Sequence, residues 1–214
     1  MNINHVRGRI SATWLIIVAA VALALGLWAG SQWLSRSPVP DLKTAVMYPA
    51  ALAVPDFQLQ RADGKSFAAT DLRGQWTIIF FGFTHCPDVC PTTLAAFKQV
   101  WAKLAERGKT DKARFLFISV DPERDTPEQL ARYVAFFNKD FVAATGTNAE
   151  LTRLTRALGI LYLRVPDQSG GYSIDHSASA MIIDPEGRRA GMFRPPFEPD
   201  AVSADILALI DSSR

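Results

Sequence analysis

The two cysteines of the chain lie four positions apart, in a segment whose residue types suit thiol chemistry. Cys86 and Cys90 occur in the stretch FGFTHCPDVCP, between an apolar run typical of a buried strand and a run of helical periodicity. A helix start offers free backbone N–H groups and a positive dipole end, which lower the pKa of a nearby thiol. Because a thiolate attacks disulfides and binds soft metal ions, the pair is predicted to be reactive or metal-binding.

The spacing of the pair, Cys-x3-Cys, differs from the Cys-x2-Cys of ordinary dithiol oxidoreductases. Residues four apart face the same side of a helix, and with an intervening loop two sulfurs can hold one ion between them. They can also form a disulfide if their Cβ atoms come within about 4.5 Å. A purely structural disulfide is the alternative, but closing about five residues would contribute only about 2 kcal/mol.

Two thiolates leave a coordination position open, and the chain has three histidines that could fill it. Soft sulfur ligands favour Cu(I), and imidazole suits copper in either oxidation state, so copper is the candidate ion. His5 lies before the apolar N-terminal segment, and His85 is expected to shape the loop or face solvent. His176 precedes a strand predicted to lie beside the one that leads to the cysteines, so its imidazole could reach the sulfurs. Otherwise it is an ordinary surface or core histidine.

Two aspartates follow the second predicted buried strand, in the stretch DPERDTP. Strands of this kind of sheet end on one edge, so Asp121 could lie near the cysteines and hydrogen-bond a metal ligand. Asp125 has a simpler explanation, because Thr126 and Pro127 mark the start of a helix.

The elements that must position these residues alternate between strand and helix. Strands are predicted at 56–60, 76–83, 115–120, 178–183 and 189–193, and helices around 94–104, after Thr126, at 150–158 and at 200–210. This order predicts an α/β fold with a mixed sheet and flanking helices, as in thioredoxin-like proteins.

The N-terminal segment predicts a membrane anchor. Residues 10–34 carry no charge and are long enough to cross a hydrocarbon core of about 30 Å. Arg7 and Arg9 place residues 1–9 in the cytoplasm, so the rest of the chain is expected in the periplasm, anchored by one span in the inner (cytoplasmic) membrane. A cleaved signal peptide is the alternative, although Leu27-Trp28-Ala29 is a poor cleavage site.

The remainder is predicted to be a proline-containing linker, residues 35–50, and one domain, residues 51–214. The net charge of +2 comes from Arg7 and Arg9, since the other 21 basic residues balance all 21 acidic ones. No basic block interleaved with aromatic residues occurs, which argues against nucleic-acid binding.

Three stretches, FGFTHCPDVCP, SVDPERDTP and IDHSASAMIIDPEG, resemble the Sco/SenC family of membrane-anchored copper chaperones. The resemblance extends from about Val54 to Ile210. It implies a thioredoxin-like fold, a copper ion bound by Cys86, Cys90 and His176, and Asp121 and Asp125 in the two positions of the acidic motif. It also implies delivery of copper to the binuclear copper (CuA) site of cytochrome c oxidase subunit II. A periplasmic copper donor and a thiol reductant are possible further partners.

Two other functions remain open. In the first, the cysteines act as a thiol–disulfide oxidoreductase that reduces the copper-ligand cysteines of that subunit, which requires no His176. In the second, the chain is a peroxidase of the peroxiredoxin type, which would need a cation beside the reactive thiol, whereas Asp88 is the charged neighbour here.

Overall fold

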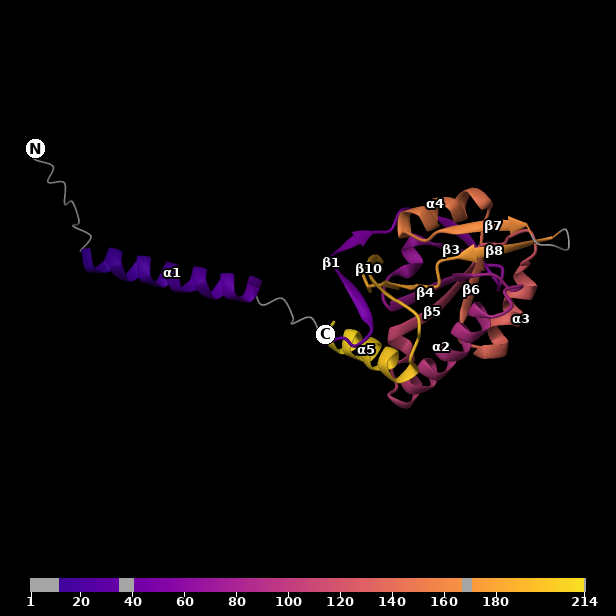
Figure 1. The fold of residues 1–214 in the computed structure, drawn as a ribbon. Coiled ribbons are helices and arrows are strands. Elements are labelled where there is room, and N and C mark those ends of the chain that lie inside the picture. The colour runs from indigo at the N-terminus through magenta and orange to yellow at the C-terminus, as the bar shows by residue number, and fades with distance from the viewer. Residues whose placement is uncertain (1–11, 35–40, 167–170, 214) are drawn as a thin grey trace, which may run out of the picture. The chain divides into compact units, whose positions relative to one another are not determined.

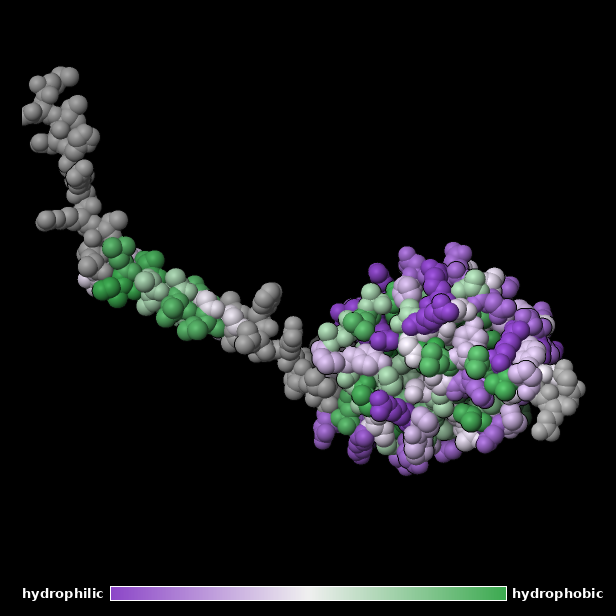
Figure 2. Space-filling model, turned by 45° about the horizontal axis from the view of Figure 1, so that its top comes forward, coloured by the Kyte–Doolittle hydropathy of each residue, from purple (hydrophilic) through white to green (hydrophobic). Residues whose placement is uncertain are grey.

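The computed structural model describes residues 12–34, 41–166 and 171–213, which belong to two units divided after residue 39. The described part of the first unit is helix α1 (Ala12–Leu34) (Figure 1). The side chains of this helix that the structure describes are largely hydrophobic (Figure 2). No helix within the described residues combines the length and apolar character needed to span a membrane. The predicted cytoplasmic tail, residues 1–9, lies outside the described residues, as do residues 10 and 11 of the predicted anchor and 35–40 of the predicted linker.

The second unit is built on an eight-stranded mixed sheet with the order β1-β10-β9-β4-β5-β6-β2-β3 (Figure 1). Strand β4 pairs in parallel with β5, and β5 with β6, while every other pair in the sheet is antiparallel. The strands are β1 (Ala45–Ala53), β2 (Gln58–Arg61), β3 (Ser66–Ala68), β4 (Trp76–Gly82), β5 (Ala113–Ser119), β6 (Val142–Thr145), β9 (Ala180–Ile183) and β10 (Arg188–Phe193).

Helices cover both faces of the sheet, which explains why the central strands are largely apolar. Every residue of β4 is buried, as the continuous apolar run predicted. Helix α2 packs against α5 and α3 on one face, and α4 lies on the other (Figure 1). The helices are α2 (Val89–Glu106), α3 (Pro127–Phe137), α4 (Asn148–Leu158) and α5 (Pro199–Ser212), with short 3-10 turns η1 (Ala69–Leu72) and η2 (Thr110–Lys112).

Helix α3 begins where the sequence predicted, directly after Thr126. The hydroxyl of Thr126 accepts a hydrogen bond from the backbone N–H of Gln129 at 3.3 Å, and the Gln129 side chain accepts one from the Thr126 N–H at 3.0 Å. This reciprocal capping, with Pro127 in the first turn, fixes where the chain turns after the acidic motif.

Besides the short strands β3 and β6, which the sequence analysis did not predict, two parts of the fold differ from the sequence-based expectation. Strand β1 begins at Ala45, inside the predicted linker, and pairs with β10 across a register shift between Met47 and Leu52. Pro49 lies within that irregular stretch, which is tolerated because β1 is an edge strand. The second difference is a separate hairpin of β7 (Tyr162–Pro166) and β8 (Tyr172–His176), which the sequence analysis did not predict.

Candidate metal centre

The topology brings three chain segments to one edge of the sheet. The cysteine segment directly follows β4, and the acidic motif follows β5, which runs parallel to β4. Strand β9 runs antiparallel to β4, with Ala180 opposite Phe80, so the residues that lead into β9 lie where β4 ends. His176 is the last residue of β8 and precedes Ala180 by four positions. The convergence expected for His176 therefore follows from strand direction.

The three predicted ligands meet at this edge. The Sγ of Cys90 lies 3.4 Å from Nε2 of His176, and the Cys86 Sγ accepts a hydrogen bond from the Cys90 N–H at 3.4 Å. All three donor atoms lie within 4.8 Å of one another, and both cysteines are free thiols. Metal–sulfur bonds of about 2.3 Å and metal–nitrogen bonds of about 2.0 Å, the values for zinc, would separate planar donors by about 4 Å. The spacing suits one small ion between them.

The imidazole of His176 is oriented by its neighbours. Its Nδ1 lies 3.1 Å from the carbonyl oxygen of Ser177, which can only accept, so Nδ1 is the donor in this contact. Nε2 is therefore the ring nitrogen that faces the sulfurs and that would bind a metal ion. The rings of Phe80 and Phe83 pack edge-on against the imidazole, with centroid distances of 5.8 and 6.1 Å, and limit its rotation.

The two cysteines have opposite acidities. A hydrogen bond from the Cys90 thiol lowers the pKa of Cys86 to about 3, helped by His176 and by the backbone N–H groups of Cys90 and Asp88, against the opposing effect of burial. The same thiol–thiolate bond, together with burial, raises the pKa of Cys90. Cys90 is fully buried in the first turn of α2, while Cys86 is half-buried. The reduced pair therefore holds one proton, between a thiolate and a thiol.

A shallow cleft gives access to the pair. Its volume is about 340 Å³, and Cys86 and His176 line it together with residues from the loop before α2 and from β8. Asp88 and Asp175, both exposed, are the charged side chains in this lining. Two carboxylates beside a thiolate favour the approach of cations.

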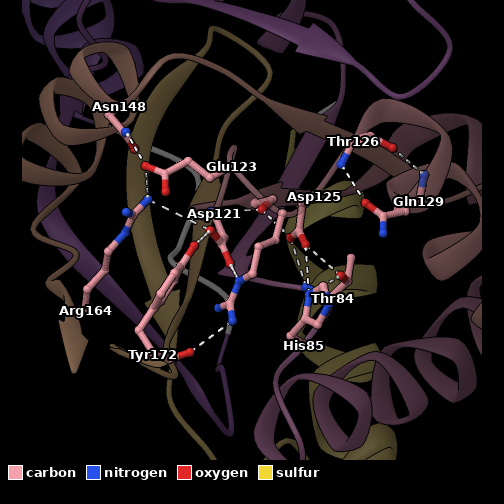
Figure 3. A network of polar contacts seen from close by, with 12 residues as sticks. Thr84, His85, Asp121, Glu123, Asp125, Thr126, Gln129, Asn148, Arg164 and Tyr172 are labelled. Carbon is pink, nitrogen blue, oxygen red and sulfur yellow. Dashed lines mark hydrogen bonds and ion pairs between the residues drawn. The ribbon is translucent and has the colours of Figure 1, made fainter. Parts of the chain in front are cut away.

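Asp125 holds the cysteine loop. Its carboxylate accepts hydrogen bonds from the backbone N–H of Thr84 at 2.9 Å, from the Thr84 hydroxyl at 2.6 Å and from the hydroxyl of Ser119 at 2.5 Å (Figure 3). Thr84 lies two residues before Cys86. Asp125 is thus more than a residue at a helix start, because its buried carboxylate joins the end of β5 to the loop that carries the thiolate.

Asp121 holds a different segment. Its buried carboxylate accepts a hydrogen bond from the Tyr172 hydroxyl at 2.7 Å and pairs with the guanidinium of Arg124 (Figure 3). Tyr172 is the first residue of β8, the strand that ends at His176. Within the described chain, neither aspartate hydrogen-bonds a cysteine sulfur. They act on the ligands by holding the segments that carry them, and the negative charge of Asp125 also contributes to the raised pKa of Cys90.

His85 does not join the three donors. Its side chain is 48% exposed, and Nδ1 lies 3.1 Å from the Thr84 hydroxyl and 3.5 Å from an Asp125 oxygen. This position agrees with a loop-shaping role. Sequence reasoning did not identify Thr84, Ser119 or Tyr172, whose signal was limited to their place inside or next to the motifs.

Comparison with known proteins gives one consistent result. The model of the SCO1/SenC family matches residues 46–211. A putative copper-binding protein of Stutzerimonas stutzeri is 32% identical over 192 residues, which cover 90% of this chain and 94% of that protein. The mitochondrial SCO2 homolog of Bos taurus is 34% identical over 82% of this chain but 66% of its own length, so the chain spans about two thirds of this longer relative.

Solved structures agree with the sequence relatives. The crystal structure of Arabidopsis thaliana ScoI with copper bound matches with a TM-score of 0.69 and 32% identity, over 74% of this chain and 99% of that one. A family match over most of the domain and a similar fold at this identity lead to the same conclusion: the chain belongs to the SCO1/SenC family.

Proposed function

We propose that this protein is a copper chaperone that binds one copper ion through Cys86, Cys90 and His176 and transfers it to the CuA site of cytochrome c oxidase subunit II. The convergence of two sulfurs and one imidazole, from segments 86 residues apart, carries the proposal. Soft thiolates with one imidazole suit Cu(I). A relative described as copper-binding and a relative solved with copper bound support the choice of ion. The family resemblance supports the choice of recipient.

The protein's own groups prepare the site for the ion. Cys86 is already a thiolate at neutral pH, and Nε2 of His176 faces the sulfurs, so Cys90 is the thiol that must lose its proton. The incoming ion takes the place of the proton shared between the sulfurs. Because binding then releases this proton, copper affinity should fall as the pH is lowered.

Copper titration of the purified, reduced full-length protein tests the ligand set. The Cys86→Ala, Cys90→Ala double variant should lose tight binding, and His176→Ala should bind more weakly with an altered copper spectrum. Tyr48→Leu is the control, because Tyr48 lies on the edge strand β1 outside the donor set, and it should bind like the wild type. Tight stoichiometric binding by the double cysteine variant would exclude the proposal.

Transfer is tested by mixing the copper-loaded chain with the soluble domain of an oxidase subunit II whose CuA site is empty. The expected result is loss of copper from this chain and appearance of the CuA absorption on the recipient. A periplasmic copper donor and a thiol reductant would complete the cycle, since the site must be refilled and kept reduced.

A thiol–disulfide oxidoreductase is the second candidate function, favoured by the asymmetry of the cysteines. The half-buried Cys86 thiolate would attack one sulfur of a disulfide in subunit II and form a mixed disulfide. The buried Cys90, as its thiolate, would then attack Cys86, release the two reduced thiols of the substrate and leave a Cys86–Cys90 disulfide. If His176→Ala blocks oxidase assembly but leaves dithiol reductase activity intact, the copper function is the essential one. If oxidase assembly survives His176→Ala but fails when either cysteine is replaced, disulfide reduction is the essential function.

Anchoring of the domain outside the cytoplasm by residues 10–34 is part of the proposal. The uncharged apolar run and the arginines before it support this arrangement. In a bacterial host, the chain should stay with the membrane fraction after alkaline extraction, and the domain should be digested by protease added to spheroplasts. Release of an intact domain into the periplasmic fraction would instead indicate a cleaved signal peptide.

A further inference from the structure

The hairpin that carries His176 depends on contacts outside itself. Strands β7 and β8 pair only with each other among the described residues and do not join the eight-stranded sheet. An isolated two-stranded hairpin is at best marginally stable in water. The position of the His176 ring over the cysteines must therefore come from what holds the hairpin against the domain.

Tyr172 makes a dense set of such contacts. The guanidinium carbon of Arg124 lies 3.8 Å from the centroid of its ring. That of Arg164, which belongs to β7 of the hairpin itself, lies 4.8 Å away. The Tyr172 hydroxyl donates to Asp121 at 2.7 Å, and the Tyr172 carbonyl oxygen accepts from Nη1 of Arg124 at 3.0 Å. We call these four residues, Asp121, Arg124, Arg164 and Tyr172, the Tyr172 clamp.

The clamp is itself fixed to the domain (Figure 3). Asp121 is completely buried, and its backbone N–H donates to the Ser119 hydroxyl at 3.0 Å, directly after β5. Arg124 pairs with Asp121, and Arg164 pairs with Glu123 at 2.8 Å. Each guanidinium beside the ring is thus paired with a carboxylate, so the cation–π contacts are made by charges that have partners.

The strand connects the clamp to the metal ligand. Tyr172, Ile174 and His176 alternate along β8 and lie on the same face, because side chains of a strand repeat every two residues. Ile174, between them, is 4% exposed, so this face of the strand packs into the domain. A strand of five residues held at its first side chain has little freedom left at its last one.

We propose that Tyr172 is a positioning residue for copper binding: the Tyr172 clamp fixes β8 so that Nε2 of His176 meets the cysteine sulfurs. This inference rests on the proposed function and identifies what controls its third ligand. Tyr172→Leu removes both cation–π contacts and the hydroxyl. Loss of a group that orients a metal ligand typically costs 10- to 100-fold in affinity, so copper should bind at least about tenfold more weakly. The copper spectrum should approach that of His176→Ala.

A double-mutant cycle separates positioning from general damage. If Tyr172 acts through His176, adding Tyr172→Leu to His176→Ala should cause no further loss of copper affinity. Losses that multiply in the double variant would overturn the proposal. Tyr172→Phe, which keeps the ring contacts and loses only the hydroxyl, should give a smaller effect and keeps the test valid if the leucine variant does not fold.

Tyr48 provides a matched control. Arg189 lies 4.9 Å from its ring centroid on the edge strand β1, so Tyr48→Leu removes the same type of contact away from the hairpin. Copper binding of this variant should equal that of the wild type. An equal loss of affinity in the Tyr48 and Tyr172 variants would overturn the proposal.

A metal-free measurement distinguishes this inference from the proposed function. In the reduced protein without copper, the ring resonances of His176 in a two-dimensional NMR spectrum should shift or broaden in Tyr172→Leu and stay unchanged in Tyr48→Leu. If the wild type binds no copper but these resonances respond, the positioning role holds and the copper function fails. Unchanged resonances in Tyr172→Leu would overturn the positioning role.

Discussion

Cys86 carries a negative charge because its neighbours donate to its sulfur. The Cys90 thiol makes the largest contribution to its pKa of about 3. An unperturbed thiol with a pKa of about 8.5 would react about tenfold more slowly for each pH unit below that value. Alkylation of Cys86 by iodoacetamide should instead be nearly constant between about pH 8 and pH 5 and fall only near pH 3. Mass spectrometry of the modified peptide measures the rate.

Cys90→Ala is the informative comparison for this profile. Removing the donor that lowers the pKa of Cys86 most should raise that pKa and make alkylation depend on pH in the neutral range. Tyr48→Leu, which changes a residue of the edge strand β1 outside the site, should keep the flat profile. An identical profile in the wild type and in Cys90→Ala would contradict the thiol–thiolate pairing.

Gly82 leaves the space that the Cys90 sulfur fills. A Cβ atom at this position would lie 2.7 Å from the Cys90 Sγ and 2.8 Å from the ring of Phe117. Both neighbours are fully buried, so Gly82→Ala must displace one of them. Such overpacking costs about 1–3 kcal/mol of unfolding free energy, and a displaced sulfur should also weaken copper binding. Urea unfolding and copper titration measure the two effects.

Gly146→Ala tests whether the copper effect is local. Its Cβ atom would lie 2.6 Å from a methyl group of Leu59, a similar degree of crowding without contact to a cysteine. This variant should lose stability but keep the copper affinity of the wild type. If both glycine variants lose copper affinity in proportion to their stability, Gly82 has no specific role at the site.

The sequence predicted the donor atoms but not the residues that orient them. Cysteine and histidine are identified by type, and strand direction places them, so the convergence of Cys86, Cys90 and His176 could be predicted without coordinates. The roles of Gly82, Thr84 and Tyr172 arise from contacts across the fold, such as the Tyr172 hydroxyl reaching Asp121 from 51 residues away. Residue type and spacing contain no signal for such pairs.

At the scale of elements, α5 holds the start of the domain through one carboxylate. Asp205 is 1% exposed and accepts hydrogen bonds from the N–H groups of Lys43, Thr44 and Ala45 at 2.7–2.8 Å and from the Thr44 hydroxyl at 2.8 Å. The contact fixes the residues that lead into edge strand β1, inside the predicted linker. The C-terminal helix thus determines where the folded domain begins.

Asp205→Asn should destabilise the domain in a pH-dependent way. Burial alone would raise the pKa of Asp205, but the three N–H groups and the hydroxyl outweigh it and lower that pKa. Its stabilisation is therefore present above the unfolded-state pKa of about 3.9 and is lost as the pH falls through the folded-state value. At pH 7 the variant should lose about 2–3 kcal/mol, since hydrogen bonds to a charged group contribute about 1.5–3 kcal/mol.

Urea unfolding near pH 7 and near pH 3 measures the Asp205 effect. The difference in unfolding free energy between the wild type and Asp205→Asn should narrow at the lower pH, where the wild-type carboxylate begins to bind a proton. Asp200→Asn is the control: Asp200, exposed in the first turn of the same helix, pairs at the surface with Lys103. A gap that is equal at both pH values would show that the Asp205 carboxylate charge does not stabilise the domain.

Helices and strands could be predicted where burial or helix capping requires a recognisable pattern of residue types. The uninterrupted apolar run of β4 and the Thr126 cap of α3 are such patterns, and both predictions are confirmed. The sequence of β1 shows no alternation of apolar and polar residues and contains Pro49, so it predicts a linker rather than a strand. The β7–β8 hairpin is short and held by the Tyr172 clamp, a tertiary contact, so local sequence does not reveal it.

At the scale of the whole molecule, the site joins parts of the domain that lie far apart in the sequence. The cysteines follow β4, His176 ends a hairpin outside the main sheet, and the two aspartates after β5 hold both segments in place. The fold keeps these segments at one edge because parallel β4–β5 and antiparallel β4–β9 pairing bring the relevant strand ends together. Copper should therefore stabilise the domain as a whole.

Copper-linked unfolding tests this coupling. A ligand that binds only the native state adds about 2.7 kcal/mol to the unfolding free energy when its free concentration is about 100 times its Kd. Reduced wild-type protein should gain stability of this order in buffered Cu(I), and His176→Ala, at the same free copper concentration, should gain less because its Kd is higher. Oxidised protein should gain no stability from copper, because its two sulfurs are bonded to each other and neither is a thiolate. Equal stabilisation of the reduced and oxidised forms would place the copper elsewhere, because only the reduced pair offers two thiolates to the ion.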